Sequence, residues 1–181
     1  MKNSIIIAAF ALGAFVFGTN QAQAQEEATT TVNITLADVI SIDAGSVASG
    51  GEINFNYVTA KDYNEGLGAV TQENALIVTS TKNFNVTVKA GGEDFLYGTI
   101  GSIPVDVLTI SVASGGTMGG TAAPITLSAI DQTLVTNAPL GSALTLDLNY
   151  EIPAEKSSSS DILGKPAGAY KQTVTYTATA L

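Results

Sequence analysis

Apolar and polar side chains alternate through residues 142–152, and this pattern limits the segment to one kind of structure. Side chains of a β-strand point to opposite faces in turn, so alternation predicts a strand with one buried and one hydrated face. A helix of the same sequence would scatter its apolar residues around the axis. The expected buried positions are Leu144, Leu146, Leu148, Tyr150 and Ile152.

A second alternating segment, residues 169–180, predicts the last strand of the chain. Val174, Tyr176 and Ala178 share one face, and every residue between them is a threonine. Threonine is β-branched and suits a strand surface that faces water. Residues 153–168, which separate the two segments, are rich in Pro, Gly and Ser, and we expect them to cross between two sheets.

Shorter alternating segments recur along the chain, separated by turn-forming residues at intervals of roughly ten residues. We see no helical periodicity long enough to predict a helix. These features predict an all-β fold, an immunoglobulin-like or pilin-like β-sandwich of short antiparallel strands. The further strands are expected at residues 32–36 with a continuation at 39–42, and at 52–58, 75–80, 84–90, 105–113, 125–129 and 131–136.

The N-terminus has the features of a secretory signal peptide, which we assign to residues 1–24. Lys2 precedes an apolar run, and Ala22-Gln23-Ala24 supplies the small residues that signal peptidase accepts. We expect residues 25–30 to be a flexible lead-in and residues 31–181 to form a single domain. The protein is therefore expected in the periplasm, at the cell surface or outside a bacterial cell, without a transmembrane segment after processing.

The charge of the processed chain excludes one class of partner. Removal of the leader takes away Lys2 and leaves six lysines, no arginine and sixteen carboxylates, for a formal charge of −10. A chain this acidic is repelled by phosphate backbones. We therefore expect no nucleic-acid partner.

Missing residue types exclude most catalytic chemistry. The chain has no Cys and no His, so it cannot build a Ser-His-Asp or Cys-His centre or a zinc site from nitrogen and sulfur ligands. The densest acidic pairs, Glu93 with Asp94 and Asp43 with Glu52, are typical of solvated turns. We therefore expect no enzyme, catalytic residue, cofactor or metal site, although calcium binding near residues 62–65 stays open because calcium needs only oxygen ligands.

The C-terminal third resembles secreted bacterial β-sandwich families. The motif L-x-L-x-Y-x-I-P-A at residues 146–154, followed by P-A-G-x-Y-x-x-T-V-T-Y-T at residues 166–177, is similar to the last two strands of several such families. These are chaperone-usher pilins, spore-coat-U-like pilin relatives, a related exported domain of unknown function, and WxL domains. The resemblance implies that Tyr170 is a corner tyrosine that returns its hydroxyl to nearby backbone. The alternative is an ordinary half-buried strand tyrosine.

The chain also departs from these families. Tyr176-Thr177-Ala178 stands where WxL domains carry a Trp, which argues against wall binding. The disulfide of many pilins is impossible here, and residues 155–165 resemble an insertion.

Two function classes remain after these exclusions. The first is a non-catalytic structural or surface subunit that assembles through β-strand edges. The second is a monomeric module that binds an envelope glycan or another protein. An N-terminal strand that pairs with its own sheet and one that pairs with a neighbouring subunit are both compatible with the sequence. The candidate assembly strands contain Val32, Ile34, Leu36, Val174 and Tyr176.

Overall fold

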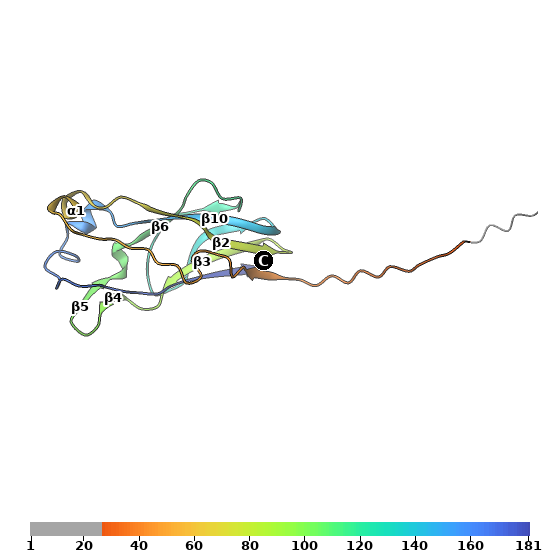
Figure 1. The fold of residues 1–181 in the computed structure, drawn as a ribbon, viewed down its shortest axis with the longest axis horizontal. Helices are drawn as coiled ribbons and strands as arrows, with labels where there is room; N and C mark the ends of the chain where they lie inside the picture. The colour runs from red at the N-terminus through yellow and green to blue at the C-terminus, as the bar shows by residue number, and fades with distance from the viewer. Residues whose placement is uncertain (1–26) are drawn as a thin grey trace, which may run out of the picture. The chain divides into compact units, whose positions relative to one another are not determined.

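The computed structural model describes residues 27–181 (Figure 1). The expected signal peptide, residues 1–24, lies outside the described residues. The chain divides into two units at Leu36, so residues 27–36 and residues 37–181 are described separately. No helix among the described residues is both long and apolar enough to cross a membrane.

The described part of the N-terminal unit contains no strand, so the strand expected at residues 32–36 is not formed. Its three apolar side chains are instead largely exposed: Val32 by 78%, Ile34 by 81% and Leu36 by 88%. Alternation selects residues that suit a strand, but the strand itself needs a hydrogen-bonded neighbour. Only the expected continuation forms, as the three-residue strand β1 (Ile40–Ile42) of the second unit.

The second unit is mostly β-structure, and all its strand pairs are antiparallel. One of its sheets curls into a half-barrel. A five-stranded sheet has the order β1, β2 (Val70–Ser80), β10 (Gly141–Glu151), β6 (Thr109–Val112) and β8 (Ile125–Thr126). A four-stranded sheet has the order β11 (Val174–Ala180), β3 (Phe84–Ala90), β9 (Gln132–Ala138) and β7 (Thr121–Ala122). A third sheet pairs β4 (Asp94–Tyr97) with β5 (Gly101–Pro104).

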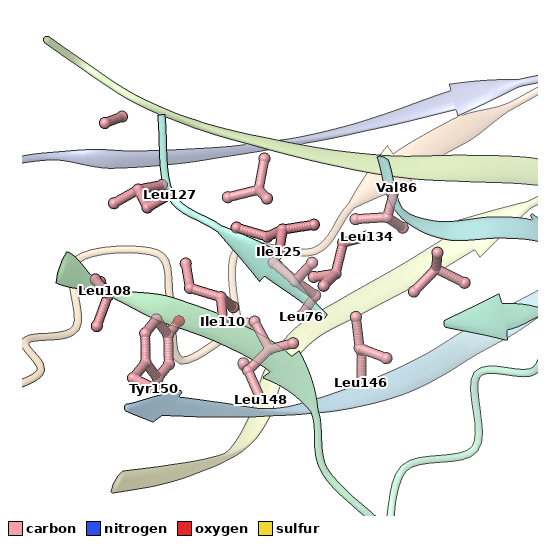
Figure 2. Close-up of a cluster of buried hydrophobic side chains, with 14 of the residues drawn as sticks. Leu76, Val86, Leu108, Ile110, Ile125, Leu127, Leu134, Leu146, Leu148 and Tyr150 are labelled. Carbon is pink, nitrogen blue, oxygen red and sulfur yellow. The ribbon is translucent and has the colours of Figure 1, made fainter. Parts of the chain in front are cut away.

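Both larger sheets contribute side chains to one hydrophobic core (Figure 2). Leu146, Leu148 and Tyr150 of β10 are buried, as predicted for residues 142–152. They pack with residues such as Val86 of β3 and Leu134 of β9 in the other sheet. The expected hydrated face is interrupted, because Asp147 is also buried and accepts a hydrogen bond from the Asn74 amide at 2.7 Å. Residues 153–168 then connect β10 to β11, so the predicted crossover between the two sheets is also confirmed.

The last strand begins later than predicted, at Val174 instead of residue 169. Its alternation is confirmed, since Val174, Tyr176 and Ala178 are half-buried and the threonines between them are exposed. Of the five residues before Val174, Thr173 still accepts a backbone hydrogen bond from Gly91 beside β3, but Lys171 pairs with another sheet. Lys171 exchanges two backbone hydrogen bonds with Leu96 of β4, at 2.9 and 3.0 Å, so the pairing of β11 with β3 does not extend to residue 171.

Three further segments differ from their expected structure. Of residues 125–129, only Ile125–Thr126 forms a strand, β8. Residues 52–58 are not a strand. The segment expected as one strand at 105–113 begins with a 3₁₀ turn, η1 (Val105–Val107), before β6.

Two short helices, α1 (Ala60–Glu65) and α2 (Ala154–Ser157), also appear where no helix was expected. Six and four residues are too few for helical periodicity to be recognised in a sequence.

Candidate functional site

The second unit contains an open groove with a volume of about 860 Å³. Two stretches of chain form its walls: residues 50–58, which we call the first wall, and residues 165–174 with Tyr176, which we call the second wall. The most buried apolar lining residues form its floor and come from η1 and the residue after it, from β10 and from the crossover. They are Val107, Leu108, Tyr150 and Ile162.

The first wall alternates like a strand but has no strand partner. Ile53, Phe55 and Tyr57 are half-buried, while the residues between them are exposed. Among the described residues, no backbone group of residues 51–57 makes a backbone hydrogen bond. The side chains of residues 52–58 therefore alternate as the sequence predicts. The backbone lacks the ladder of hydrogen bonds that defines a strand.

The first wall is fixed near both ends. At its start, the Ala48 amide donates to the Ala75 carbonyl of β2 at 3.0 Å. At its end, the Tyr57 hydroxyl lies 2.7 Å from the hydroxyl of Ser157, which is fully buried. The Tyr57 ring also packs against Tyr63, with ring centroids 4.9 Å apart. Between these anchors, Ser49 and Gly50 make turn hydrogen bonds, and residues 51–56 are held by the packing of their side chains.

Helix α1 adds a cap directly after the first wall. The Asp62 carboxylate accepts hydrogen bonds from the amides of Val58 at 2.8 Å and Thr59 at 2.7 Å. These two bonds lower the pKa of Asp62 because they stabilise its charged form. The acidic stretch 62–65 thus lies in and beside a helix whose first carboxylate is used for capping.

The second wall includes a strand edge that faces the groove. Within residues 27–181, strand β11 pairs with β3 alone, and backbone bonds join Thr173 to Gly91 and Leu181 to Asn83 on that side. Backbone groups of an antiparallel strand alternate between its two edges. The groups of Val174 and Tyr176 therefore point away from β3, and they have no backbone partner among the described residues.

Tyr170 supports the approach to this edge. Its hydroxyl donates to the Pro166 carbonyl at 2.7 Å, which is the contact that the corner-tyrosine interpretation requires. Its ring packs on Tyr97 of β4, with centroids 5.7 Å apart. The second wall is thus held by a side-chain bond, a ring contact and the Lys171 bridge to β4.

A chain of hydroxyls crosses the base of the groove. Tyr150 donates to Gln72 Oε1 at 3.2 Å and lies 2.7 Å from the Tyr176 hydroxyl, so Tyr176 is the donor to Tyr150. Burial raises the pKa of both tyrosines, and the neighbouring Tyr150 raises that of Tyr176 further. Both phenols stay neutral at physiological pH and cannot act as bases there.

Aromatic side chains gather at the groove. Nine aromatics occur in residues 27–181, and seven of them line it. They are Phe55, Tyr57, Tyr63, Phe95, Tyr150, Tyr170 and Tyr176. Of the two other aromatics, Tyr97 packs on Tyr170 beside the groove, and Phe84 is fully buried in the core.

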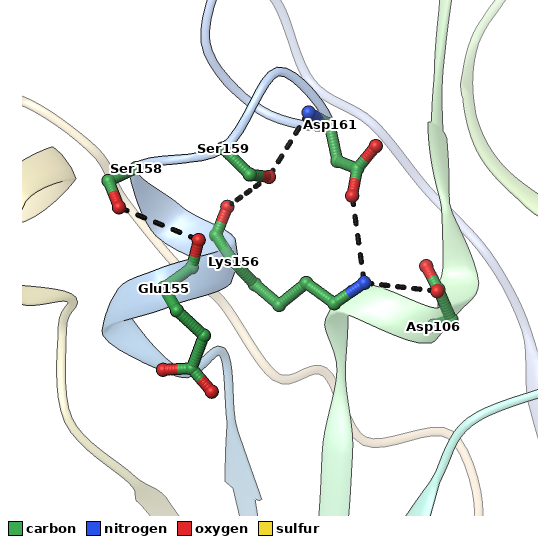
Figure 3. Close-up of polar contacts among 6 residues, drawn as sticks. All are labelled: Asp106, Glu155, Lys156, Ser158, Ser159 and Asp161. Atoms are coloured by element: carbon green, nitrogen blue, oxygen red, sulfur yellow. Dashed lines mark hydrogen bonds and ion pairs between the residues drawn. The ribbon is translucent and has the colours of Figure 1, made fainter.

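A cluster of charges joins the crossover to η1 (Figure 3). Lys156 Nζ lies 3.0 Å from Asp106 Oδ2 and 3.6 Å from Asp161 Oδ2. The bond to Asp106 raises the pKa of Lys156 because it stabilises the ammonium form. The cluster ties α2 to the turn that carries Val107, and so it supports the groove floor from outside.

The structure brings together some candidate residues and separates others. Val174, Tyr176 and Tyr170 line the same groove, whereas Val32, Ile34 and Leu36 are exposed in the other unit. Sequence reasoning missed the first wall as a binding surface because its alternation reads as an ordinary strand. The floor was not predicted either, because its residues come from segments that are far apart in the sequence.

Comparisons with known proteins do not identify this site. No protein-family model matches the chain, and a search of curated proteins finds no significant match.

Proposed function

We propose that this protein is a non-catalytic, exported structural subunit whose copies assemble through β-strand edges. Residues 31–36 of one copy add as a strand to the free edge of β11 in the groove of another copy. The observation that carries this proposal is that one chain holds both parts. It has a groove of mixed polar and apolar lining beside a strand edge, and an exposed alternating segment, neither of which has a strand partner among the described residues.

Spacing and length support residues 31–36 as the occupant. Val32, Ile34 and Leu36 lie two residues apart, as do the groove-facing Ile53, Phe55 and Tyr57. A six-residue strand spans about 20 Å, and the matching stretch of the first wall has the same length. An added strand would therefore place its three apolar side chains over the groove, with the same two-residue spacing as the three apolar side chains of the first wall.

Energetics also favour this occupant. Complete burial of a Val, Leu or Ile side chain contributes about 1.5 to 3 kcal/mol. Three such residues contribute about 5 to 9 kcal/mol, and the ladder hydrogen bonds add to this. The sum is comparable to the cost of association, about 4 to 15 kcal/mol. A soluble subunit with reversible assembly is consistent with these magnitudes.

The charges around the groove also support residues 31–36 of a second copy as the occupant. The whole chain is acidic, but the groove lining contains Lys165 and Lys171 with a single carboxylate, Glu52. Glu26 and Glu27 precede the occupant, whereas Asp38 after it already pairs with Lys82. Opposite charges at a rim favour encounter and orientation more than final affinity.

We further propose that the two larger sheets form an immunoglobulin-like or pilin-like sandwich with Tyr170 at its corner. The shared core and the bond from Tyr170 to Pro166 support this interpretation. In such a sandwich, β11 is an edge strand that lies beside the first wall, and an edge strand can accept a further strand.

The alternative function is a monomeric module that binds an envelope glycan, and the seven aromatics of the groove favour it. Sugar rings stack on exposed aromatic faces. Several of these rings instead pack on one another or on the core, including the Tyr57–Tyr63 pair and Phe95. This makes strand addition the better explanation of the groove.

Electron microscopy of sheared surface material tests the choice between these functions. An antibody to the compact unit should label filaments or layers, and purified chain starting at Gln25 should form particles whose mass in light scattering rises with concentration. A strictly monomeric chain that binds envelope glycan fragments, with no labelled assemblies, would contradict the proposal in favour of the alternative.

A further inference from the structure

We propose that Tyr57 and Tyr63 form a site of oxidative cross-linking, at which a one-electron oxidant joins the two phenol rings as dityrosine. Tyr57 ends the first wall and Tyr63 lies in α1, so the bond joins these two segments. The oxidant that the reaction needs is hydrogen peroxide acting through a haem peroxidase. The site does not depend on the proposed assembly through strand edges.

The composition of the chain directs one-electron oxidation to tyrosine. The chain has no Cys, Trp or His, so its six tyrosines are the side chains from which one electron is most easily removed. Methionine reacts with peroxide in a different way, by gaining an oxygen atom, and Met118 packs against the core. Radicals formed on this chain are therefore tyrosyl radicals.

The rings of Tyr57 and Tyr63 are in contact. Their centroids lie 4.9 Å apart and their planes are inclined by 38°, which is within the range of packed aromatic pairs. Both residues are half-buried, so solvent still reaches the pair. The Tyr57 ring is also held by its hydroxyl, which donates to Ser157 because Ser157 itself donates to the Ile152 carbonyl. Two reacting rings that are already held together couple with little further movement.

The other four tyrosines also form two pairs, but their geometry suits coupling less well. Dityrosine joins the ring carbons next to the hydroxyl group. The centroids of Tyr97 and Tyr170 are 5.7 Å apart with planes inclined by 55°, and such a carbon of Tyr97, Cε1, packs against Gly168. Tyr150 and Tyr176 meet through their hydroxyl oxygens, 2.7 Å apart. Coupling should therefore favour Tyr57 and Tyr63.

The reaction removes one electron and one proton from each phenol. The two phenoxyl radicals form a carbon–carbon bond between the ring positions next to their hydroxyl groups, and the hydrogen on each of these carbons then moves to the phenol oxygen. The peroxide takes up the two electrons and two protons and leaves as two water molecules. Burial raises the pKa of Tyr57, so its phenol is protonated at physiological pH and loses its proton on oxidation.

The cross-link gives a covalent tie to a chain that cannot form a disulfide. It closes only the short loop of residues 57–63, so it restricts the unfolded chain little. Its effect is local, because it keeps the end of the first wall beside α1 even when the bond between Tyr57 and Ser157 breaks.

Peroxidase treatment of the chain from Gln25, followed by tryptic mapping of the monomeric fraction, tests the inference. The intact mass should fall by two hydrogen atoms. Trypsin cleaves after Lys61, which separates the two tyrosines, so their bond joins the peptides 25–61 and 62–82. These joined peptides should be at least about tenfold more abundant than those from any other tyrosine pair, because proximity governs coupling.

Two variants control the assignment. Tyr63→Phe keeps the ring but removes the phenol, and it should abolish the joined peptides. Tyr97→Phe is the matched control and should leave their yield unchanged, with circular dichroism showing that both variants are folded. An equal or larger yield of the bond between Tyr97 and Tyr170 would overturn the inference. So would oxygen gain at Met118 without any loss of hydrogen from the chain.

Discussion

Leu148→Ala is expected to lower the free energy of unfolding by about 2 to 5 kcal/mol. Leu148 is fully buried, and its strand β10 pairs with β2 on one side and with β6 on the other. Neighbours fixed in two ladders cannot collapse far into the space that the lost side chain leaves. For a domain of this size the melting temperature should fall by roughly 5 to 15 °C.

Thr175→Ala is the matched control for this loss. Thr175 is an exposed residue of β11, opposite Lys89 of β3, so its removal should cost less than about 1 kcal/mol. Urea unfolding followed by circular dichroism measures both variants, since the chain has no Trp. Similar losses from the two substitutions would mean that both faces of the last strand are buried.

Ile34→Asp is expected to reduce assembly at least about 100-fold, a change of about 3 kcal/mol. Ile34 is the central apolar residue of the proposed donor strand, and it is largely exposed in the free subunit. Insertion of the variant would bury an unpaired carboxylate, which costs several kcal/mol. The fold of residues 37–181 should be unaffected, because Ile34 lies outside that unit.

Asn33→Asp separates this effect from simple charge repulsion. It adds the same charge one residue away, on the face that stays in water when the strand is added. Light scattering should find assembly close to that of the parent chain. Equal losses from both variants would indicate repulsion between subunits, and assembly by both would exclude residues 31–36 as the donor.

Alternation does not by itself predict backbone pairing, and in residues 32–36 it does not predict burial either, since Val32, Ile34 and Leu36 are largely exposed. Three segments illustrate this limit. Residues 142–152, 52–58 and 32–36 all alternate, yet only the first is a paired strand in the structure. Alternation reports which residues can share a face. A ladder depends on a neighbour from elsewhere in the chain, or from another chain, and no local pattern records that neighbour.

The candidate site was predictable only in part for the same reason. The alternation of the last strand predicts that Val174 and Tyr176 share one face. The motif around Tyr170 predicts its place at the corner before that strand. The floor depends on Val107 and Ile162, which lie 55 residues apart and meet through the charge cluster around Lys156. Contacts at such separation follow from the tertiary arrangement, which the local sequence does not encode. By contrast, the Thr59 and Asp62 capping box could have revealed α1.

Engineered disulfides between two copies test the central claim most directly, because the chain has no cysteine to interfere. Chains carrying Val32→Cys, Ile34→Cys or Leu36→Cys are each mixed with a chain carrying Val174→Cys and oxidised. Disulfides form only when the two Cα atoms lie within about 7 Å. The account predicts a mixed disulfide dimer from at least one inward position and none from Asn33→Cys or Thr35→Cys. No mixed dimer from any inward position, or a bond that forms only within a single chain carrying both substitutions, would contradict it.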